Sequence, residues 1–265
     1  EVSQDLGSLQ ERAAAVAQRF SNSFAQDMAA LGVCMPDEQP TVSGHIDEII
    51  AFIEQLIAKG HAYESQGDVY FSIASLLSYG SLSKKPLDEM IAGIRVQVSE
   101  AKREPGDFVL WKGGVEGAFW SSPWGNGRPG WHIECSTFAH KYCGETVDIH
   151  GGGQDLVFPH HENECAQSEA LTEQPFVRHW LHNAHVNLRK EKMSKSLGNF
   201  FTIREVLAQY DTETTRYFLT TGHYRSQLNY STDNLNQARA SVERIYTALR
   251  DTQPDNDYVL DKTNS

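Results

Sequence analysis

Short apolar segments and glycine-rich turns alternate with helix-like stretches from residue 131 to residue 200. Thr146–His150 predicts a strand that leads into the three glycines Gly151–Gly153, and a helix is expected from about Pro159 to Leu171. A further strand candidate covers His185–Leu188. Strands that alternate with helices and glycine-rich turns favour an α/β domain with a parallel sheet.

Two amphipathic helices are predicted ahead of this region. Apolar residues recur every three to four positions over residues 8–31 and again over residues 45–59. Gly32 and Gly60 follow these stretches, at positions where glycine commonly ends a helix. We expect both helices to pack into the core through their apolar faces.

Residues 61–130 have a different, strand-rich character. Asp68–Ile73 and Phe108–Trp111 are strand candidates, because β-forming residues gather in both segments. Glycine and proline accumulate in residues 122–130, which are therefore predicted to be a loop. The region is expected to be a β-rich insertion that ends in this loop.

Composition excludes several classes of protein. The 265 residues carry 23 Lys and Arg against 35 Asp and Glu, a net charge of −12, and 40% of the residues are apolar. That apolar fraction excludes wholesale disorder, and no apolar run is long enough to span a membrane. The acidic balance argues against a general nucleic-acid binder but leaves room for a local basic patch. Four cysteines in a chain of this length fit a reduced, cytoplasmic protein better than a disulfide scaffold.

Cys135, His160 and Glu164 form a candidate metal site. His160 and Glu164 are four residues apart, so a helix would place the imidazole and the carboxylate on one face. Thiolate, imidazole and carboxylate together suit Zn²⁺. A buried cysteine beside a surface His–Glu pair is the alternative interpretation. Three ligands also leave a fourth position open, either for a substrate or for a ligand from outside this chain.

A second candidate site is the segment Lys192–Asn199, which has two lysines and two serines. It precedes a helix that Thr202 and Glu205 would begin with a capping box. Lysines supply positive charge and serines supply hydrogen bonds to phosphates, whereas a solvated basic loop is the alternative. Gly151–Gly153 would let a backbone approach a ligand closely. Neither the dinucleotide-binding glycine pattern nor the phosphate-binding loop of NTPases is present, which disfavours a dehydrogenase and a P-loop NTPase.

Taken together, four motifs resemble those of one enzyme family. Lys192–Ser196 reads KMSKS, a signature of class I aminoacyl-tRNA synthetases. Gly130–Ser136, Asp148–Leu156 and Phe158–Glu164 resemble the active-site segments of the cysteinyl-tRNA synthetases. The resemblance runs in order from near residue 1 to about residue 250, and KMSKS alone would indicate only the class.

The resemblance implies a role for each motif. Cys135, His160 and Glu164 match zinc ligands whose metal binds the thiol of the substrate cysteine. Lys192 and Lys195 match catalytic lysines of a mobile loop that contacts ATP. Two further sets are implied, namely the ATP-binding residues Gly152 and Asp155, and a cysteine pocket made of Trp131, His132, His150 and His161.

The resemblance also implies the fold. We expect the nucleotide-binding, Rossmann-like parallel sheet of class I synthetases, with a β-containing connective insertion and a C-terminal helical region that contacts the tRNA stem. The implied domains are the helical end of the first half of the catalytic domain (1–60), the insertion (61–130), the second half of the catalytic domain (131–200), and the stem-contact region with a linker (201–265).

The implied reaction is the ATP-dependent activation of cysteine to cysteinyl-adenylate, followed by transfer to tRNA(Cys). ATP is a substrate, with Mg²⁺. One Zn²⁺ per chain would select the substrate thiol, because zinc takes a thiolate far more readily than the neutral hydroxyl of serine. Two alternatives stay open: the related cysteine ligase of mycothiol biosynthesis, and a truncated, non-catalytic paralogue that binds zinc, tRNA or a partner.

The sequence departs from the family pattern at both ends. The HIGH signature is absent, and so is the cysteine just before it that serves as the fourth zinc ligand; Cys34 follows the first long helix and is not that residue. The anticodon-reading helices are missing beyond about residue 250. Three explanations are open: the sequence is only a portion of the enzyme, the N-terminal half is a separate segment, or the chain is a natural truncated paralogue. Glu1 in place of a methionine favours the first two, and we expect the missing N-terminal half to be a partner of this chain.

Overall fold

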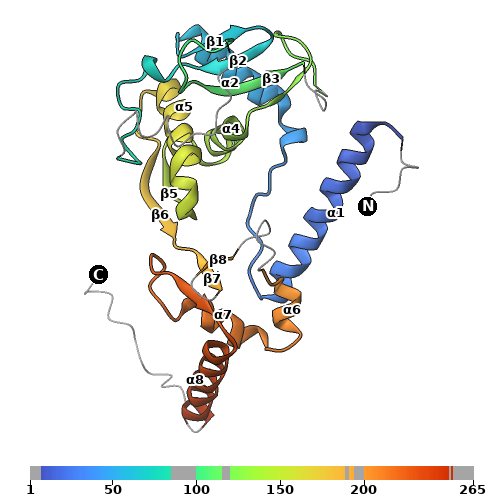
Figure 1. Ribbon diagram of the computed structural model, residues 1–265, viewed down its shortest axis with the longest axis vertical. Coiled ribbons are helices and arrows are strands. Elements are labelled where there is room, and N and C mark those ends of the chain that lie inside the picture. The colour runs from blue at the N-terminus through green and yellow to red at the C-terminus, as the bar shows by residue number, and fades with distance from the viewer. Residues whose placement is uncertain are drawn as a thin grey trace. The chain divides into compact units, whose positions relative to one another are not determined.

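The computed structural model describes residues 7–84, 100–114, 120–188, 191–193, 200–250 and 252. The chain divides into two compact units (Figure 1). The first comprises Glu1–Ser23 and Met35–Asn183, and the second comprises Phe24–Cys34 and Ala184–Ser265. Helix α1 (Leu9–Ala30) contributes residues to both units. None of the helices in the described ranges combines the length and the apolar character that crossing a membrane requires.

An antiparallel, four-stranded sheet lies within residues 61–130. The strands pair in the order β1 (Ala62–Ser65), β2 (Asp68–Phe71), β3 (Phe108–Gly113) and β4 (Gly127–Pro129). Gln66 and Gly67 join β1 to β2, and both have positive φ, 56° and 81°, which suits a two-residue hairpin turn. The predicted β-rich character of residues 61–130 is confirmed. One correction concerns residues 122–130, where part of the predicted loop is the strand β4.

One hydrophobic core joins this sheet to three helices (Figure 1). Helix α2 (Ile46–Ala58) buries one apolar face against the sheet, as its sequence predicts, and Gly60 follows it with φ 83°. Ile133 of α4 (Trp131–Cys143) and Ala166 of α5 (Glu162–Thr172) belong to the same core as Trp111 of β3. The insertion and the helices after it are thus packed as one body. The four-part division at residues 60, 130 and 200 stays a prediction.

Helix α1 has the predicted bounds but not the predicted burial. None of its residues is buried, and the side chain of Phe20 is 62% exposed. The expectation that α1 packs into the core is therefore wrong for the part of the chain that the structure describes. Hydrophobic spacing shows that a helix has an apolar face, but it does not show which surface covers that face.

Two parallel strands carry the α/β pattern. β5 (Val147–Gly153) and β6 (Val177–Asn183) pair in parallel, and α5 lies between them in sequence as a crossover. The parallel arrangement was expected, but Gly151–Gly153 continues β5 rather than forming a turn, and β6 has no counterpart among the predicted strands. Short helical turns connect these elements, at Val42–Gly44, Ile73–Ser75, Gln154–Leu156 and Val157–His161.

The second unit combines a small sheet with three helices. Its strands pair in the order β8 (Glu191–Lys192), β7 (Val186–Leu188) and β9 (Leu228–Tyr230), with β7 and β9 parallel. Helix α6 (Ile203–Leu207) begins with the predicted capping box, and α7 (Thr212–Thr220) and α8 (Thr232–Arg250) follow. The helical prediction for the last quarter is confirmed, apart from β9. Phe218 and Leu235 centre the core of this unit.

Replacing Gly130 with alanine is expected to lower the free energy of unfolding by about 1–3 kcal/mol. A Cβ atom at this position would lie 2.0 Å from the carbonyl oxygen of Val109, so β3 or the start of α4 would have to move. Gly222→Ala is the control, because a Cβ there meets open space. Urea unfolding measures both variants, and equal stabilities would contradict the expectation.

Candidate metal centre and its surroundings

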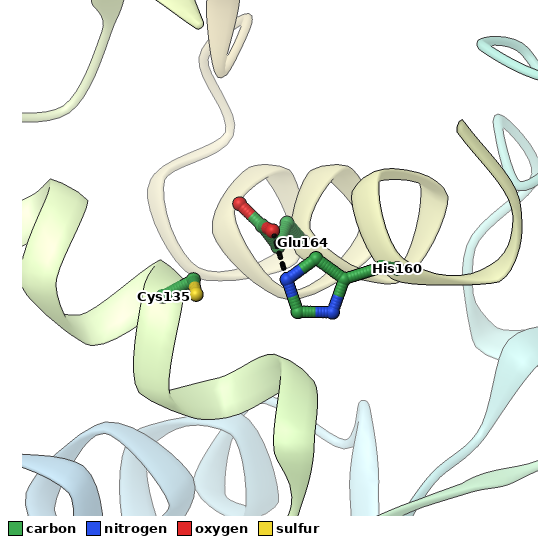
Figure 2. Close-up of side chains that lie close together, drawn as sticks. All are labelled: Cys135, His160 and Glu164. Atoms are coloured by element: carbon green, nitrogen blue, oxygen red, sulfur yellow. Dashed lines mark ion pairs between the residues drawn. The ribbon is translucent and has the colours of Figure 1, made fainter. Parts of the chain in front are cut away.

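Two packed helices bring the three predicted metal ligands together. Cys135 lies near the start of α4, His160 in the turn that leads into α5, and Glu164 in the first turn of α5. One ligand atom from each residue lies within 4.8 Å of the other two. Figure 2 shows Cys135 facing His160 and Glu164 from a separate helix. The hydroxyl of Ser136 donates to Oε1 of Gln167 at 2.6 Å and fixes α4 against α5.

The carboxylate of Glu164 is buried without a hydrogen bond. Glu164 is 1% exposed, with Oε1 2.8 Å from Nε2 of His160 and Oε2 3.3 Å from Nε2 of His150. Both distances are within ion-pair range, but neither oxygen has a partner in hydrogen-bonding geometry. A buried, uncompensated carboxylate is costly unless a cation or donors satisfy it. The donor set of sulfur, nitrogen and oxygen around it fits Zn²⁺.

A second group of possible ligands shares the same carboxylate. His150, His161 and Glu164 also offer atoms within 4.8 Å of one another. Only the group with Cys135 includes sulfur, the soft ligand that selects zinc over harder cations. A single ion at the Cys135 group would use Oε1 of Glu164 and leave Oε2 facing His150. His150 is thus close enough to the second oxygen to orient the carboxylate.

The thiol of Cys135 is held in its protonated form in the absence of a cation. Burial is the main cause that raises the pKa of Cys135 to about 12, and the negative charges of Glu164 and Glu134 add to it. Burial also raises the pKa of Glu134 to about 7. A divalent cation reverses this balance, because it stabilises the thiolate directly.

His132 and Trp131 surround the ring of His160. Nδ1 of His132 lies 2.9 Å from Nδ1 of His160, so the opposite nitrogen of His160 is left to face Glu164. Burial lowers the pKa of His132 to about 3, and the charge of His160 contributes in the same direction. The Trp131 side chain is 58% exposed, and its ring centroid lies 4.3 Å from that of His160. Trp131 and His132, two of the four residues predicted for the cysteine pocket, thus border the candidate metal site.

Two residues that border the site, Trp180 and His182, were not predicted from the sequence. Nδ1 of His161 lies 2.8 Å from Nε2 of His182, and the ring of Trp180 lies 4.8 Å from His150 and 5.0 Å from His161. Burial, followed by the neighbouring histidines, lowers the pKa of His161 to about 3. Trp180 and His182 are two residues apart on β6, and therefore share one face of that strand. The alternation was present in the sequence, but β6 itself was not recognised.

The structure describes the remaining predicted site residues only in part. Gly152 lies in β5, and a Cβ there would approach Cε1 of His161 to 2.7 Å, so only glycine leaves room for that ring. Asp155 is exposed in the turn after β5. The backbone of Lys192 lies in β8, whereas Lys195 lies outside the described residues. Cys34 is exposed and belongs to none of the metal-ligand groups found among the described residues.

Replacing His150 with alanine is expected to weaken zinc binding by roughly 10–100-fold without removing it. The substitution takes away the imidazole beside Oε2 of Glu164, and loss of a group that orients a metal ligand has an effect of this size. His179→Ala, on the exposed side of the neighbouring strand, is the matched control. Competition with a chromophoric chelator measures both affinities. An unchanged affinity in His150→Ala would show that His150 does not orient Glu164.

Comparison with known proteins identifies the family. A family model described as the class I (C) tRNA synthetase catalytic domain matches residues 6–240. The chain belongs to this family. Two curated relatives of this chain are named cysteine–tRNA ligase. The protein from Geobacter sulfurreducens is 59% identical over 88% of this chain and 49% of its own length, and that from Colwellia psychrerythraea is 56% identical over 96% and 56%.

Solved structures support the class I fold of this synthetase domain. Mycobacterium tuberculosis methionyl-tRNA synthetase bound to methionyl-adenylate aligns with a TM-score of 0.62 at 17% identity, over 90% of this chain and 56% of that one. A putative arginyl-tRNA synthetase from Campylobacter jejuni gives 0.53 at 14%, over 94% and 51%. The expected Rossmann-like class I fold is thus confirmed. The chain spans about half the length of the curated relatives it matches.

Proposed function

We propose that the chain is part of a cysteine–tRNA ligase, which activates cysteine with ATP and Mg²⁺ and transfers it to tRNA(Cys). The observation that carries the proposal is the buried thiol, imidazole and carboxylate of Cys135, His160 and Glu164, with both oxygens of Glu164 lacking a hydrogen bond. The names of the relatives point the same way. All four cysteines are free, which supports a reducing, cytoplasmic location.

Cys135, His160 and Glu164 would hold one Zn²⁺ per chain. When bound, zinc supplies a soft Lewis acid that takes a thiolate far more readily than a neutral hydroxyl. His132 orients the ring of His160, and His150 lies against the second oxygen of Glu164. Because burial keeps His132 neutral, it can act as a hydrogen-bonding partner without adding a positive charge that would repel the metal.

The pocket for the substrate amino acid would be lined by residues around this cluster. Trp131 offers an exposed aromatic face beside His160. His150 and His161 lie beside the carboxylate of Glu164, and His132 lies against the ring of His160. Burial holds the pKa of each of these three rings, His132, His150 and His161, below its usual value. Neutral imidazoles can position a cysteine substrate through hydrogen bonds without repelling its ammonium group.

Lys192 and Lys195 would stabilise the negative charge that develops on the phosphates of ATP as the cysteine carboxylate attacks. A lysine ammonium group suits this role because it is a compact point charge that interacts with phosphate oxygens. Gly152 has no side chain, so the backbone there could approach the nucleotide closely. Asp155, exposed at the end of β5, is the polar residue proposed beside it.

Substrate selectivity can be tested on the chain itself by replacing zinc with cobalt(II). A sulfur ligand adds a charge-transfer absorption band to the cobalt spectrum. We expect L-cysteine to increase this band at concentrations at which L-serine has no effect. Shape alone separates such near-isosteres by roughly 100-fold or less, so a larger difference would be due to the thiol.

The outcomes of the cobalt experiment separate the possibilities. A cysteine-specific band that disappears in Cys135→Ala supports the proposal. Equal responses to cysteine and serine, or a chain that binds no metal, would contradict it. Cysteine-dependent exchange of pyrophosphate into ATP then tests the activation step on the same zinc-loaded chain.

A further inference from the structure

A stacked group of three exposed side chains lies in the loop between α7 and β9. The rings of His223 and Tyr224 stack with centroids 4.6 Å apart and planes inclined by 26°, and the guanidinium of Arg225 lies 5.4 Å from the centroid of Tyr224. All three residues are exposed, Tyr224 by 38%. Among the described residues, no carboxylate pairs with Arg225. Neither the zinc site nor the lysine loop accounts for this group.

Hydrogen bonds hold this loop in one conformation. The backbone amide of Ala184 donates to the carbonyl oxygen of Tyr224 at 2.8 Å, and the amide of Ser226 donates to that of His223 at 2.8 Å. Gln227, which follows the stacked group in the chain, accepts a hydrogen bond from the side chain of the buried Asn187 at 3.0 Å. A surface that is already ordered loses less entropy when it binds a partner.

The segments that meet at this loop contain no acidic residue. None occurs between Glu213 and Asp233, and none occurs between Glu173 and Glu191, in a chain whose net charge is −12. The first of these stretches includes Arg216 and Arg225. The stretches of sequence that lead into and out of this loop therefore add no negative charge beside Arg225, which suits a negatively charged partner.

We propose that the stacked group of His223, Tyr224 and Arg225 binds unpaired nucleotides of RNA. Bases stack on aromatic rings and on guanidinium planes, and the guanidinium also pairs with phosphate. A double helix keeps its bases stacked internally and would offer only phosphates, which do not require an aromatic surface. The inference rests on the proposed function, because it assigns to this loop a part of the tRNA.

Two RNA probes test the inference on the 265-residue chain. One is a fluorescent hairpin with a short single-stranded 3′ end, and the other is the same hairpin with a blunt end. We expect Tyr224→Leu and Arg225→Gln to bind the single-stranded end about tenfold more weakly than the wild type, which is the effect of losing one stacked base. Binding of the blunt hairpin should stay the same.

Matched controls separate this effect from a general loss of charge or fold. Phe24→Leu removes another exposed aromatic ring of the same unit, and Arg244→Gln removes an exposed arginine of α8. Both should bind both probes as the wild type does, and circular dichroism verifies that all four variants are folded. An unchanged affinity of Tyr224→Leu for the single-stranded end, or equal losses for both probes, would overturn the inference.

The cobalt experiment distinguishes failure of the inference from failure of the proposed function. If the cobalt spectrum responds specifically to cysteine but Tyr224→Leu binds the RNA probes with wild-type affinity, only the proposed role of the loop is overturned. RNA binding that depends on Tyr224, without a cysteine-specific spectrum, would contradict the proposed ligase and leave an RNA-binding surface.

Discussion

Replacing Glu164 with glutamine is expected to abolish zinc binding at the Cys135 site while leaving the metal-free protein folded. A neutral amide oxygen is a poorer zinc ligand than a carboxylate, so the affinity should fall by more than the roughly 100-fold that loss of an orienting group causes. Without metal, Glu164 is a buried carboxylate with no hydrogen bond. Removing its charge should therefore not lower the free energy of unfolding.

Glu162 provides a matched control on the same helix. It is also 1% exposed, but both of its oxygens are satisfied, by the backbone amides of Gly80 at 2.8 Å and Ser83 at 2.7 Å. In Glu162→Gln the side-chain amide nitrogen cannot accept, so one backbone donor loses its partner at a cost of about 1–3 kcal/mol. Zinc affinity should stay close to that of the wild type, because Glu162 belongs to neither group of metal ligands found among the described residues.

The two substitutions should therefore rank in opposite orders in two measurements. Chelator competition should find Glu164→Gln the weaker zinc binder, whereas urea unfolding in the presence of a chelator should find Glu162→Gln the less stable protein. Retention of wild-type zinc affinity in Glu164→Gln would remove Glu164 from the ligand set. If metal-free Glu164→Gln is instead the less stable of the two variants, the charge of Glu164 stabilises the metal-free protein, and the expectation is wrong.

The sequence could point to two of the candidate metal ligands because their geometry is local. His160 and Glu164 are one helical turn apart, so any helix through them places both on one face. Cys135 was grouped with them because a thiolate completes a donor set that suits zinc, but its approach to them depends on how α4 packs on α5. Trp180 and His182 were missed because they reach the site only through the pairing of β6 with β5, a contact between distant parts of the chain.

Elements were mistaken where tertiary contacts override local signals. The glycines of β5 resemble a turn in sequence, yet they extend the strand because the pairing with β6 supplies their hydrogen bonds and His161 occupies the space beside Gly152. Helix α1 was identified correctly from its period, but its burial was not, because an apolar face does not specify its partner. Helix α2, which packs against a sheet close to it in sequence, was predicted correctly in both respects.

Replacing Trp111 with alanine is expected to lower the free energy of unfolding by about 3–5 kcal/mol. The Trp111 indole is fully buried on β3, with its ring 6.0 Å from that of Trp124, so truncation leaves a large cavity. Trp111→Phe is the matched variant and should cost less than Trp111→Ala, because the cavity that it leaves is smaller. The indole nitrogen has no hydrogen-bond partner, so its removal leaves no polar group unsatisfied.

The effect of Trp111→Ala should reach the candidate metal centre, because the same core contains Ile133 of α4 and Ala166 of α5. The amide of Gly130 donates to the carbonyl of Leu110 at 2.8 Å, and this bond links β3 to the start of the helix that carries Cys135. Sheet and site should therefore unfold together, and zinc at 100 times its dissociation constant should add about 2.7 kcal/mol to wild type and Trp111→Ala alike. Urea unfolding followed by circular dichroism and by tryptophan fluorescence measures this. Two separate transitions, with zinc shifting only one, would show instead that the metal centre folds independently of the insertion.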